Sequence, residues 1–249
     1  MTIVCHGRHF IFVKTRKTAG SSVEIALSRL CGQHDFITPL GRADSSDEQL
    51  RQEEGGHPPL NWQRRWWKFR SWKEFRHRIK HGKRPMVLGG HAPASRIRDH
   101  FGKEVWCGYT TITIERNPWD KAVSRYWWMR ARSEARHGTG TFPSLSAFLE
   151  RVARERPHWL SNWDHYAIGD RVIVDRVMFY ESLQRDLYGL ADELRVDRST
   201  LTLPVRRAKG GFRKDERHYS EILSKTDRDI IASVCHREIE YFGYIYERQ

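Results

Sequence analysis

The stretch Phe10-Ile11-Phe12-Val13-Lys14-Thr15-Arg16-Lys17-Thr18-Ala19-Gly20-Ser21-Ser22-Val23-Glu24 decides the fold of this chain. Its first four residues are apolar and either β-branched or aromatic, which predicts a short buried strand. After the turn, apolar residues at 23, 26, 27 and 30 fall on one face of a helix. A strand, a tight loop and a helix start present free backbone N–H groups and the positive end of the helix dipole to an anion. The sequence therefore predicts a phosphate-binding loop.

The loop residues have the chemistry that a bound phosphate needs. Ala19 and Gly20 are small enough to let a ligand approach the backbone, and Lys17 adds a positive charge. The loop also carries hydroxyl donors at Thr18, Ser21 and Ser22. The order differs from the common nucleoside-triphosphate pattern GxxxxGK[ST], because Lys17 precedes Gly20 and no glycine stands before it. Taken alone, the stretch also fits an ordinary strand–turn–helix with a solvated lysine.

The composition favours one domain with a basic surface. A length of 249 residues fits a single α/β domain with a sizeable core. The net charge is 44 − 31 = +13, which favours anionic partners such as a nucleotide, an acidic glycan, nucleic acid or an anionic membrane. The charges are spread along the chain, so a solvated basic surface accounts for most of them.

The cysteines and the first residues of the chain indicate the cellular compartment. Cys5, Cys31, Cys107 and Cys235 are widely spaced and form no CxxC pair, so no metal site is predicted and reduced thiols are expected. Residues 1–6 lack the pattern of a signal peptide, and no apolar run approaches the ~18 residues of a membrane helix. We expect a soluble cytoplasmic protein without a membrane span.

Strands alternate with helices along the chain. Strands are predicted at 86–88, 110–114 and 172–180, besides the one at 10–13. Helices are predicted at 93–101, after Pro118, near 148–152, at 181–194 and at 226–241, while 31–60 and 129–143 are expected to be loops. This alternation predicts a single α/β domain over residues 1–249, with a mostly parallel central sheet flanked by helices.

A tract rich in tryptophan, arginine, lysine and histidine covers residues 62–83. Its apolar residues recur at helical spacing, which fits a helix with one face on the core. Aromatic residues between cations also suit stacking on bases or sugars. We interpret the segment of about 40–85 as an insert that forms a lid facing the substrate.

A second anion signal is Arg116-Asn117-Pro118-Trp119-Asp120-Lys121-Ala122-Val123-Ser124. Asn117 suits a helix N-cap and Pro118 the first helical position, so Arg116 stands at a strand end. Ser124 follows two turns into the helix. A forked guanidinium beside a hydroxyl suits a terminal phosphate. A surface arginine at a helix start would explain Arg116 alone, but not two nucleotide-type signals in this order.

Both signals resemble motifs of the sulfotransferases that use 3′-phosphoadenosine 5′-phosphosulfate (PAPS). The loop K-T-A-G-S-S resembles the 5′-phosphosulfate loop of that family, with Arg16 in place of a proline and Ser21 in place of a threonine. The arginine and serine eight residues apart resemble its 3′-phosphate motif. The resemblance extends over nearly the whole chain except about 40–85. It implies a carbohydrate-type sulfotransferase with a P-loop NTPase-like fold.

The resemblance also implies a donor site. Lys17 would neutralise the leaving oxygen, and the loop around it would hold the 5′-phosphate through Arg16, Lys17, Thr18, Ala19, Gly20, Ser21 and Ser22. Arg116 and Ser124 would hold the 3′-phosphate. The basic loop 204–217 resembles a loop that closes over that phosphate and would add Lys209 and Arg213. A merely flexible basic loop is the alternative for 204–217.

Gly90-His91-Ala92-Pro93 is a third signal. A histidine before a helix is often structural, but this one lies between the two phosphate motifs and its pKa is tunable. The segment resembles a G-H-x-P segment of the same family, in which the histidine is the general base. His91 is therefore the predicted base, with His165 and Glu181 as weaker candidates.

The predicted function is transfer of a sulfuryl group from PAPS to a hydroxyl of a carbohydrate or a small natural product, without a metal. One alternative is a Mg²⁺-dependent small-molecule kinase, which needs a strand-end carboxylate, and Glu115 and Asp175 are the nearest candidates. The other is a basic nucleic-acid-binding protein that uses the 62–83 tract. The two nucleotide-type loops favour the enzyme, so no nucleic-acid partner is expected. The sequence does not indicate an oligomeric state.

Overall fold

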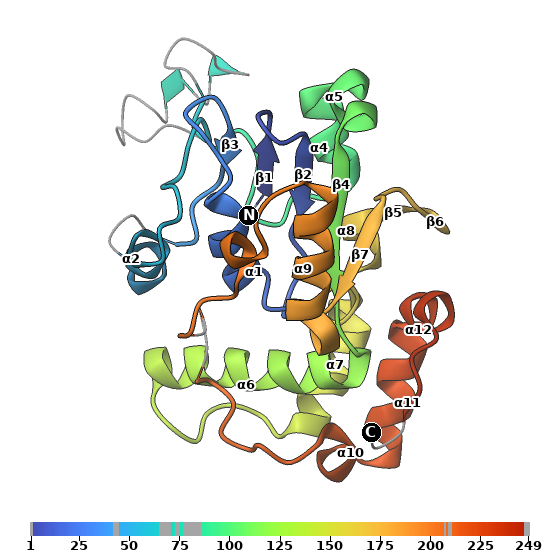
Figure 1. Ribbon diagram of the computed structural model, residues 1–249. Coiled ribbons are helices and arrows are strands. Elements are labelled where there is room, and N and C mark those ends of the chain that lie inside the picture. Colours follow the sequence, from blue (N-terminus) through green and yellow to red (C-terminus); the bar gives the residue numbers. More distant parts are fainter. Residues whose placement is uncertain are drawn as a thin grey trace.

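Five strands form the central sheet in the computed structural model of the protein, in the order β3-β1-β2-β4-β7 (Figure 1). The structure describes residues 2–41, 45–64, 71–72, 75–76, 86–206, 208 and 211–246. The strands of this sheet are β1 (Thr2–Cys5), β2 (Phe10–Val13), β3 (Phe36–Ile37), β4 (Thr110–Glu115) and β7 (Arg176–Phe179). A separate hairpin joins β5 (Ala167–Ile168) to β6 (Arg171–Val172).

The central sheet is mixed in direction, so the prediction of a mostly parallel sheet is corrected. β2 pairs in parallel with β4, and β4 with β7, but β1 pairs antiparallel with both β2 and β3. Only the four residues His6 to His9 separate β1 from β2. So short a connection can make a hairpin but not the crossover that parallel strands need.

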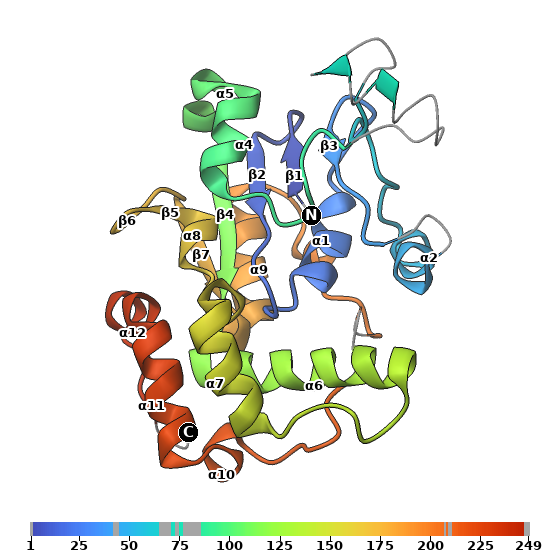
Figure 2. The same ribbon diagram turned by 180° about the vertical axis from the view of Figure 1, so that it is seen from behind.

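Helices cover both faces of the sheet and one of its ends (Figures 1 and 2). The α-helices are α1 (Gly20–Ser28), α2 (Ser46–Glu53), α4 (Ala94–Phe101), α5 (Lys103–Gly108), α6 (Pro118–His137), α7 (Leu145–Glu155), α8 (Trp163–Tyr166), α9 (Leu183–Glu193), α10 (Tyr219–Ile222), α11 (Lys225–Val234) and α12 (His236–Phe242). Short 3₁₀ turns occupy Pro157–Trp159, Tyr180–Ser182 and Arg198–Leu201.

Three large apolar clusters and a smaller one around Ile25, Leu40 and Leu50 hold the described layers together. One joins the sheet to α1 and α9, and a second joins the opposite face to α4, α5 and α8. The third lies among α6, α7, α11 and the C-terminal segment. Figure 1 shows α6 crossing below the sheet, at the end where β2 and β4 finish. This end of the sheet therefore faces the loop after β2 and the N-terminal half of α6.

Several sequence predictions of local structure need correction. Residues 31–60 contain β3 and α2, because α2 buries the charged Glu48 and Arg51 and so lacks an apolar stripe. Residues 129–137 continue α6 and do not form a loop. Residues 86–88 form no strand of the sheet, since Met86 makes only an isolated bridge to Gln63. The helices at 94–101 and 183–193 lie where they are predicted.

The predicted helix at 62–83 lies largely outside the described residues. Part of the segment predicted to form a lid is described, and it contains α2. Arg51 of α2 is fully buried and forms an ion pair with Glu24 of α1. This ion pair joins α2 to α1, and the prediction of a lid over the remaining residues stays a prediction. No helix in the described part of the chain combines the length and apolar character that crossing a membrane requires.

Candidate active site

The loop between β2 and α1 turns through left-handed backbone. Lys17 has φ 63° and Ala19 has φ 58° and ψ 16°, values that residues with a Cβ rarely adopt. Such strain persists where the surrounding structure enforces it, and it gathers at functional sites. Here Asn162 fixes the loop: its amide accepts from the Arg16 N–H and donates to the Arg16 carbonyl, both at 3.0 Å.

The loop leaves backbone donors unused. Among the described residues, no acceptor meets the backbone N–H of Thr18, Ala19, Gly20 or Ser21. These N–H groups surround the N-terminus of α1, where the helix dipole is positive. The arrangement is complementary to an anion such as a phosphate group.

The loop hydroxyls differ in what they can do. The Thr15 hydroxyl donates to the Ile114 carbonyl, so the Thr18 hydroxyl, 2.9 Å away, donates inward to Thr15. Thr18 is also fully buried, so its hydroxyl holds the loop from inside the protein. The Ser21 oxygen accepts from Lys14 Nζ at 2.8 Å, which leaves its own hydrogen free to donate.

Gly20 makes room for a buried lysine. A Cβ at Gly20 would lie 2.9 Å from Cγ of Lys14, closer than real Cβ contacts, and 3.1 Å from its Cε, which is also tight. Lys14 Nζ pairs with Glu24 at 3.3 Å, and Glu24 pairs in turn with Arg51 at 3.3 Å. The glycine therefore serves the packing of Lys14 under the loop, besides the open backbone that the sequence suggests.

Arg116 connects the second signal to the loop. Its Nη1 donates to the Lys17 carbonyl oxygen at 3.0 Å. Nε and Nη2 donate to Oδ2 of Asp120 at 2.8 and 2.6 Å, and the guanidinium lies 3.8 Å from the centre of the Tyr180 ring. The two predicted anion sites are thus adjacent, although 99 positions separate Lys17 from Arg116.

The late basic loop reaches the same place. Nη1 of Arg213 donates to Oδ1 of Asp120 at 2.8 Å, so one carboxylate holds Arg116 and Arg213 together. Lys209 lies outside the described residues.

A cavity of about 1010 Å³ opens over the loop and brings the predicted residues together. It is lined by the whole segment from Lys14 to Ser22 and by residues from four other parts of the chain. Those lining residues that the sequence singled out are His91, Arg116, Ser124, Glu181 and Arg213. Sequence reasoning missed Arg125, Trp128 and Tyr180, which also line the cavity. Arg125 and Trp128 follow Ser124 in α6, so extending the second motif by one helical turn would have found them.

His91 lies at the mouth of this cavity and is exposed. Its Nδ1 lies 3.3 Å from the Lys14 carbonyl oxygen. A carbonyl can only accept, so this contact assigns the proton to Nδ1 and leaves the Nε2 lone pair available. Desolvation by the surrounding protein, together with the Lys14 and Arg16 charges, lowers the pKa of His91, although contact with water limits the effect. The ring is therefore neutral at pH 7 and able to accept a proton.

The two weaker base candidates are placed less favourably. His165 is buried, with its ring centre 6.3 Å from that of His91, and burial followed by the Arg16 and Lys121 charges lowers its pKa to about 3. Glu181 lines the cavity, but its Oε1 accepts from the Asn117 N–H at 2.7 Å.

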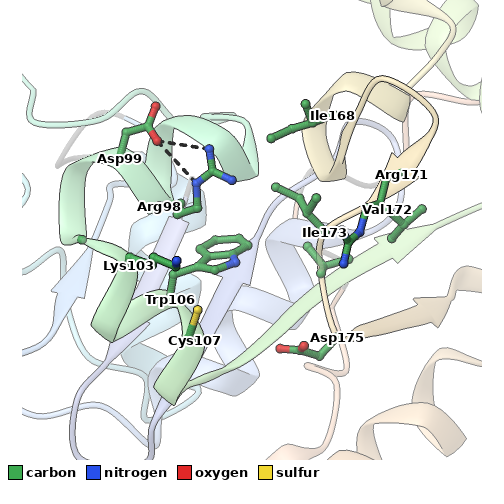
Figure 3. Close-up of a pocket in the computed structure, with 12 residues that line it drawn as sticks. Arg98, Asp99, Lys103, Trp106, Cys107, Ile168, Arg171, Val172, Ile173 and Asp175 are labelled. Atoms are coloured by element: carbon green, nitrogen blue, oxygen red, sulfur yellow. Dashed lines mark hydrogen bonds and ion pairs between the residues drawn. The ribbon is translucent and has the colours of Figure 1, made fainter.

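The carboxylates of Glu115 and Asp175, the two candidates for a metal ligand at a strand end, both accept hydrogen bonds away from the cavity. Glu115 is fully buried, accepts from Lys121 Nζ and the Tyr166 hydroxyl at 2.8 Å each, and does not line the cavity. Asp175 precedes β7 and accepts from the N–H and hydroxyl of Thr111 at 2.8 and 2.7 Å. It therefore lies at the amino end of the parallel strands, where it borders a different cavity beside Trp106 (Figure 3). Neither carboxylate is placed to hold a metal beside the loop.

One cluster among the described residues has the atom types of a metal site. The side chains of Cys5, Cys31 and Asp35 place one ligand atom each within 4.8 Å of one another, and all three are buried. The Asp35 carboxylate already accepts from the backbone N–H groups of His6 and Gly32, at 2.6 and 2.7 Å. These two hydrogen bonds show Asp35 capping the turn that follows α1, which accounts for the cluster without a metal.

Comparison with known proteins bears on the chemistry of this cavity. A family described as "Sulfotransferase family" matches residues 1–245. A protein of Archaeoglobus fulgidus, described only as uncharacterized, is 32% identical over 110 residues, which cover 42% of this chain and 88% of that protein. No solved structure matches the chain significantly.

Proposed function

Because the chain belongs to the sulfotransferase family, we propose that it transfers a sulfuryl group from PAPS to a hydroxyl group of a carbohydrate or a small natural product. A transferase of this family needs a donor site, an acceptor site and a base. The proposal assigns all three to the cavity over the β2–α1 loop. We propose a cytoplasmic enzyme that takes no nucleic-acid partner.

The observation that carries the proposal is the hydrogen bond between Arg116 and the Lys17 carbonyl. It makes two anion-binding elements neighbours on one cavity. A donor with phosphate at both its 5′ and 3′ positions requires two such elements. A nucleoside triphosphate presents its phosphates in one chain and requires only the loop.

The residues of the donor site fit a doubly phosphorylated nucleotide. The unused backbone N–H groups of the loop and the Ser21 and Ser22 hydroxyls would hold the 5′-phosphate. Arg116 uses three of its five N–H groups within the protein, so two remain for the 3′-phosphate. Ser124 and Arg213 line the same cavity, and Lys209 would join them from the late loop.

When bound, PAPS supplies the sulfuryl group and departs as 3′-phosphoadenosine 5′-phosphate (PAP). Lys17 neutralises the negative charge that grows on the phosphate oxygen as its bond to sulfur breaks. Nε2 of His91 takes the proton of the acceptor hydroxyl as the oxygen of that hydroxyl bonds to sulfur. Most of the rate enhancement comes from positioning and charge stabilisation, as in phosphoryl transfer.

A calorimetric titration with PAP and with ATP, each with and without Mg²⁺, tests this function. The proposal predicts tight binding of PAP that does not depend on the metal, and weak binding of ATP. Preferential binding of Mg·ATP would contradict sulfuryl transfer and support a kinase activity instead. Absence of binding by either nucleotide would leave a basic binding protein as the better account.

A further inference from the structure

Arg125 is a buried cation that the donor site does not use. It is 7% exposed, and its Nε is enclosed without a hydrogen-bond partner among the described residues. None of the described carboxylates forms an ion pair with it. The centre of the Trp159 ring lies 5.9 Å from the guanidinium carbon.

An unpaired buried cation is costly to a folded protein. Desolvation of an ionised group costs several kcal/mol unless a partner compensates for it. Burial, and then the neighbouring Arg16 charge, lowers the pKa of Arg125 to about 10, so the group stays charged at neutral pH. A charge kept at this cost, on the wall of an open cavity, is complementary to an anionic ligand.

The contacts of Arg125 differ from those of Arg116 and Arg213, the cations proposed for the 3′-phosphate. The neighbours of Arg125 are Arg16 and Trp159, and Arg16 donates to the carbonyl of His158 in the same 3₁₀ segment at 3.1 Å. Arg116 instead contacts the Tyr180 ring and the Asp120 carboxylate. The same carboxylate forms an ion pair with Arg213. Among the described residues, the contacts that surround Arg125 are therefore separate from those that hold Arg116 and Arg213.

Resting on the proposed sulfuryl transfer, we propose that Arg125 binds an anionic group carried by the acceptor, so that the enzyme selects acceptors with a carboxylate or a phosphate near the reacting hydroxyl. Arg125 is then a specificity residue. Its guanidinium pairs with the anionic group through charge-assisted hydrogen bonds, and the acceptor supplies the charge that the protein itself lacks there. The hydroxyl of that acceptor is left to face Lys17 and His91.

Two matched pairs of probes test this inference by calorimetry on the PAP-loaded and on the nucleotide-free protein. One pair is 4-hydroxyphenylacetate and 4-hydroxyphenylacetamide, and the other is glucose 6-phosphate and glucose. We expect the anionic member of at least one pair to bind at least about tenfold more tightly than its neutral partner. That preference should disappear in Arg125→Gln, shrink in Arg125→Lys and persist in Arg136→Gln, which removes an exposed charge from the last turn of α6.

Thermal unfolding supplies a second readout. Without a ligand, Arg125→Gln should unfold at the same temperature as the natural protein or a higher one, because an uncompensated buried charge is removed. A markedly lower unfolding temperature would make Arg125 a structural residue and overturn the inference.

Three binding results would also overturn it: equal affinity within both pairs, no binding of any of the four probes, or a preference that survives in Arg125→Gln. A loss of PAP affinity in Arg125→Gln would assign the residue to the donor instead. The natural protein's affinity for PAP is measured on the same samples. Failure of the proposed function would appear there, separately from failure of this acceptor inference.

Discussion

Arg116 Nη1 donates to the carbonyl oxygen of Lys17 at 3.0 Å, joining the end of β4 to the loop after β2. This contact follows from the parallel pairing of β2 with β4, which brings the carboxyl ends of both strands to one edge of the sheet. Each strand is followed by a loop and a helix N-terminus, so the two predicted anion-binding elements face one cavity.

Lys17→Ala should reduce the rate of sulfuryl transfer more than it weakens PAP binding. The Lys17 charge matters most when negative charge develops on the leaving oxygen, so its loss should cost roughly 10²–10³ in rate. Single-turnover kinetics beside PAP titrations measure the two effects, with Lys103→Ala at the other end of the sheet as a control. An unchanged rate at saturation with a large loss of PAP affinity would make Lys17 a plain binding residue.

His91→Asn should abolish transfer and leave PAP affinity nearly unchanged. His91 must be neutral to accept a proton, and its pKa is lowered from the ordinary value of about 6.5. The rate should therefore be constant around pH 7 and fall only on acidification, at a pH below about 6.5. Substantial turnover by His91→Asn would assign the base to another group, and Glu181→Gln would be the next variant to measure.

His165 should make folding stability sensitive to acid. Burial, then the Arg16 and Lys121 charges, lowers its pKa to about 3 in the folded protein, whereas the unfolded chain has a pKa near 6.5. The unfolded chain thus binds the extra proton first, so this contribution is fully present above about pH 6.5 and is lost as the pH falls toward the folded value. The free energy of unfolding, measured with urea at a series of pH values, should fall with acidification less steeply in His165→Gln than in the natural protein. The difference in slope should be roughly 1.4 kcal/mol per pH unit between about pH 6 and pH 4. Equal slopes in the two proteins would contradict this.

Gly20→Ala should destabilise the protein and distort the loop. The new methyl group would lie 2.9 Å from Cγ of Lys14, whose amine is held by Ser21 and Glu24. We expect a loss of roughly 1–3 kcal/mol in the free energy of unfolding, the usual cost of overpacking. Gly7→Ala is the matched control, since a Cβ there meets nothing within 4 Å. Equal stability of the two variants would show that Lys14 moves aside freely.

The parts that sequence predicts well are local ones. The stretch from Phe10 to Glu24 carries its strand, turn and helix signals within fifteen residues, and Asn117-Pro118 marks the start of α6 in the same way. β1 escaped prediction because its four residues read as an unremarkable N-terminus, and its pairing with β2 is what makes the sheet mixed. No short pattern records a pairing between distant segments.

Buried charge accounts for the remaining misses. Glu48 and Arg51 of α2 look like solvated residues, but they are buried because Glu24, distant in sequence, pairs with Arg51. Asp120 reads as a first-turn helix residue, and only the fold shows it holding Arg116 and Arg213. Arg125 likewise reads as a surface cation. The role of a charged side chain can be inferred only when its burial and its partners are known. Neither can be read from the neighbouring sequence.

The affinity ratio of PAP to AMP, measured by calorimetry without metal, tests the central claim most directly. AMP lacks only the 3′-phosphate, so the ratio isolates the site formed by Arg116 and Ser124. The account predicts that PAP binds roughly 10- to 100-fold more tightly than AMP, and that Arg116→Ala removes most of this difference. Equal affinities of the natural protein for PAP and AMP would contradict it.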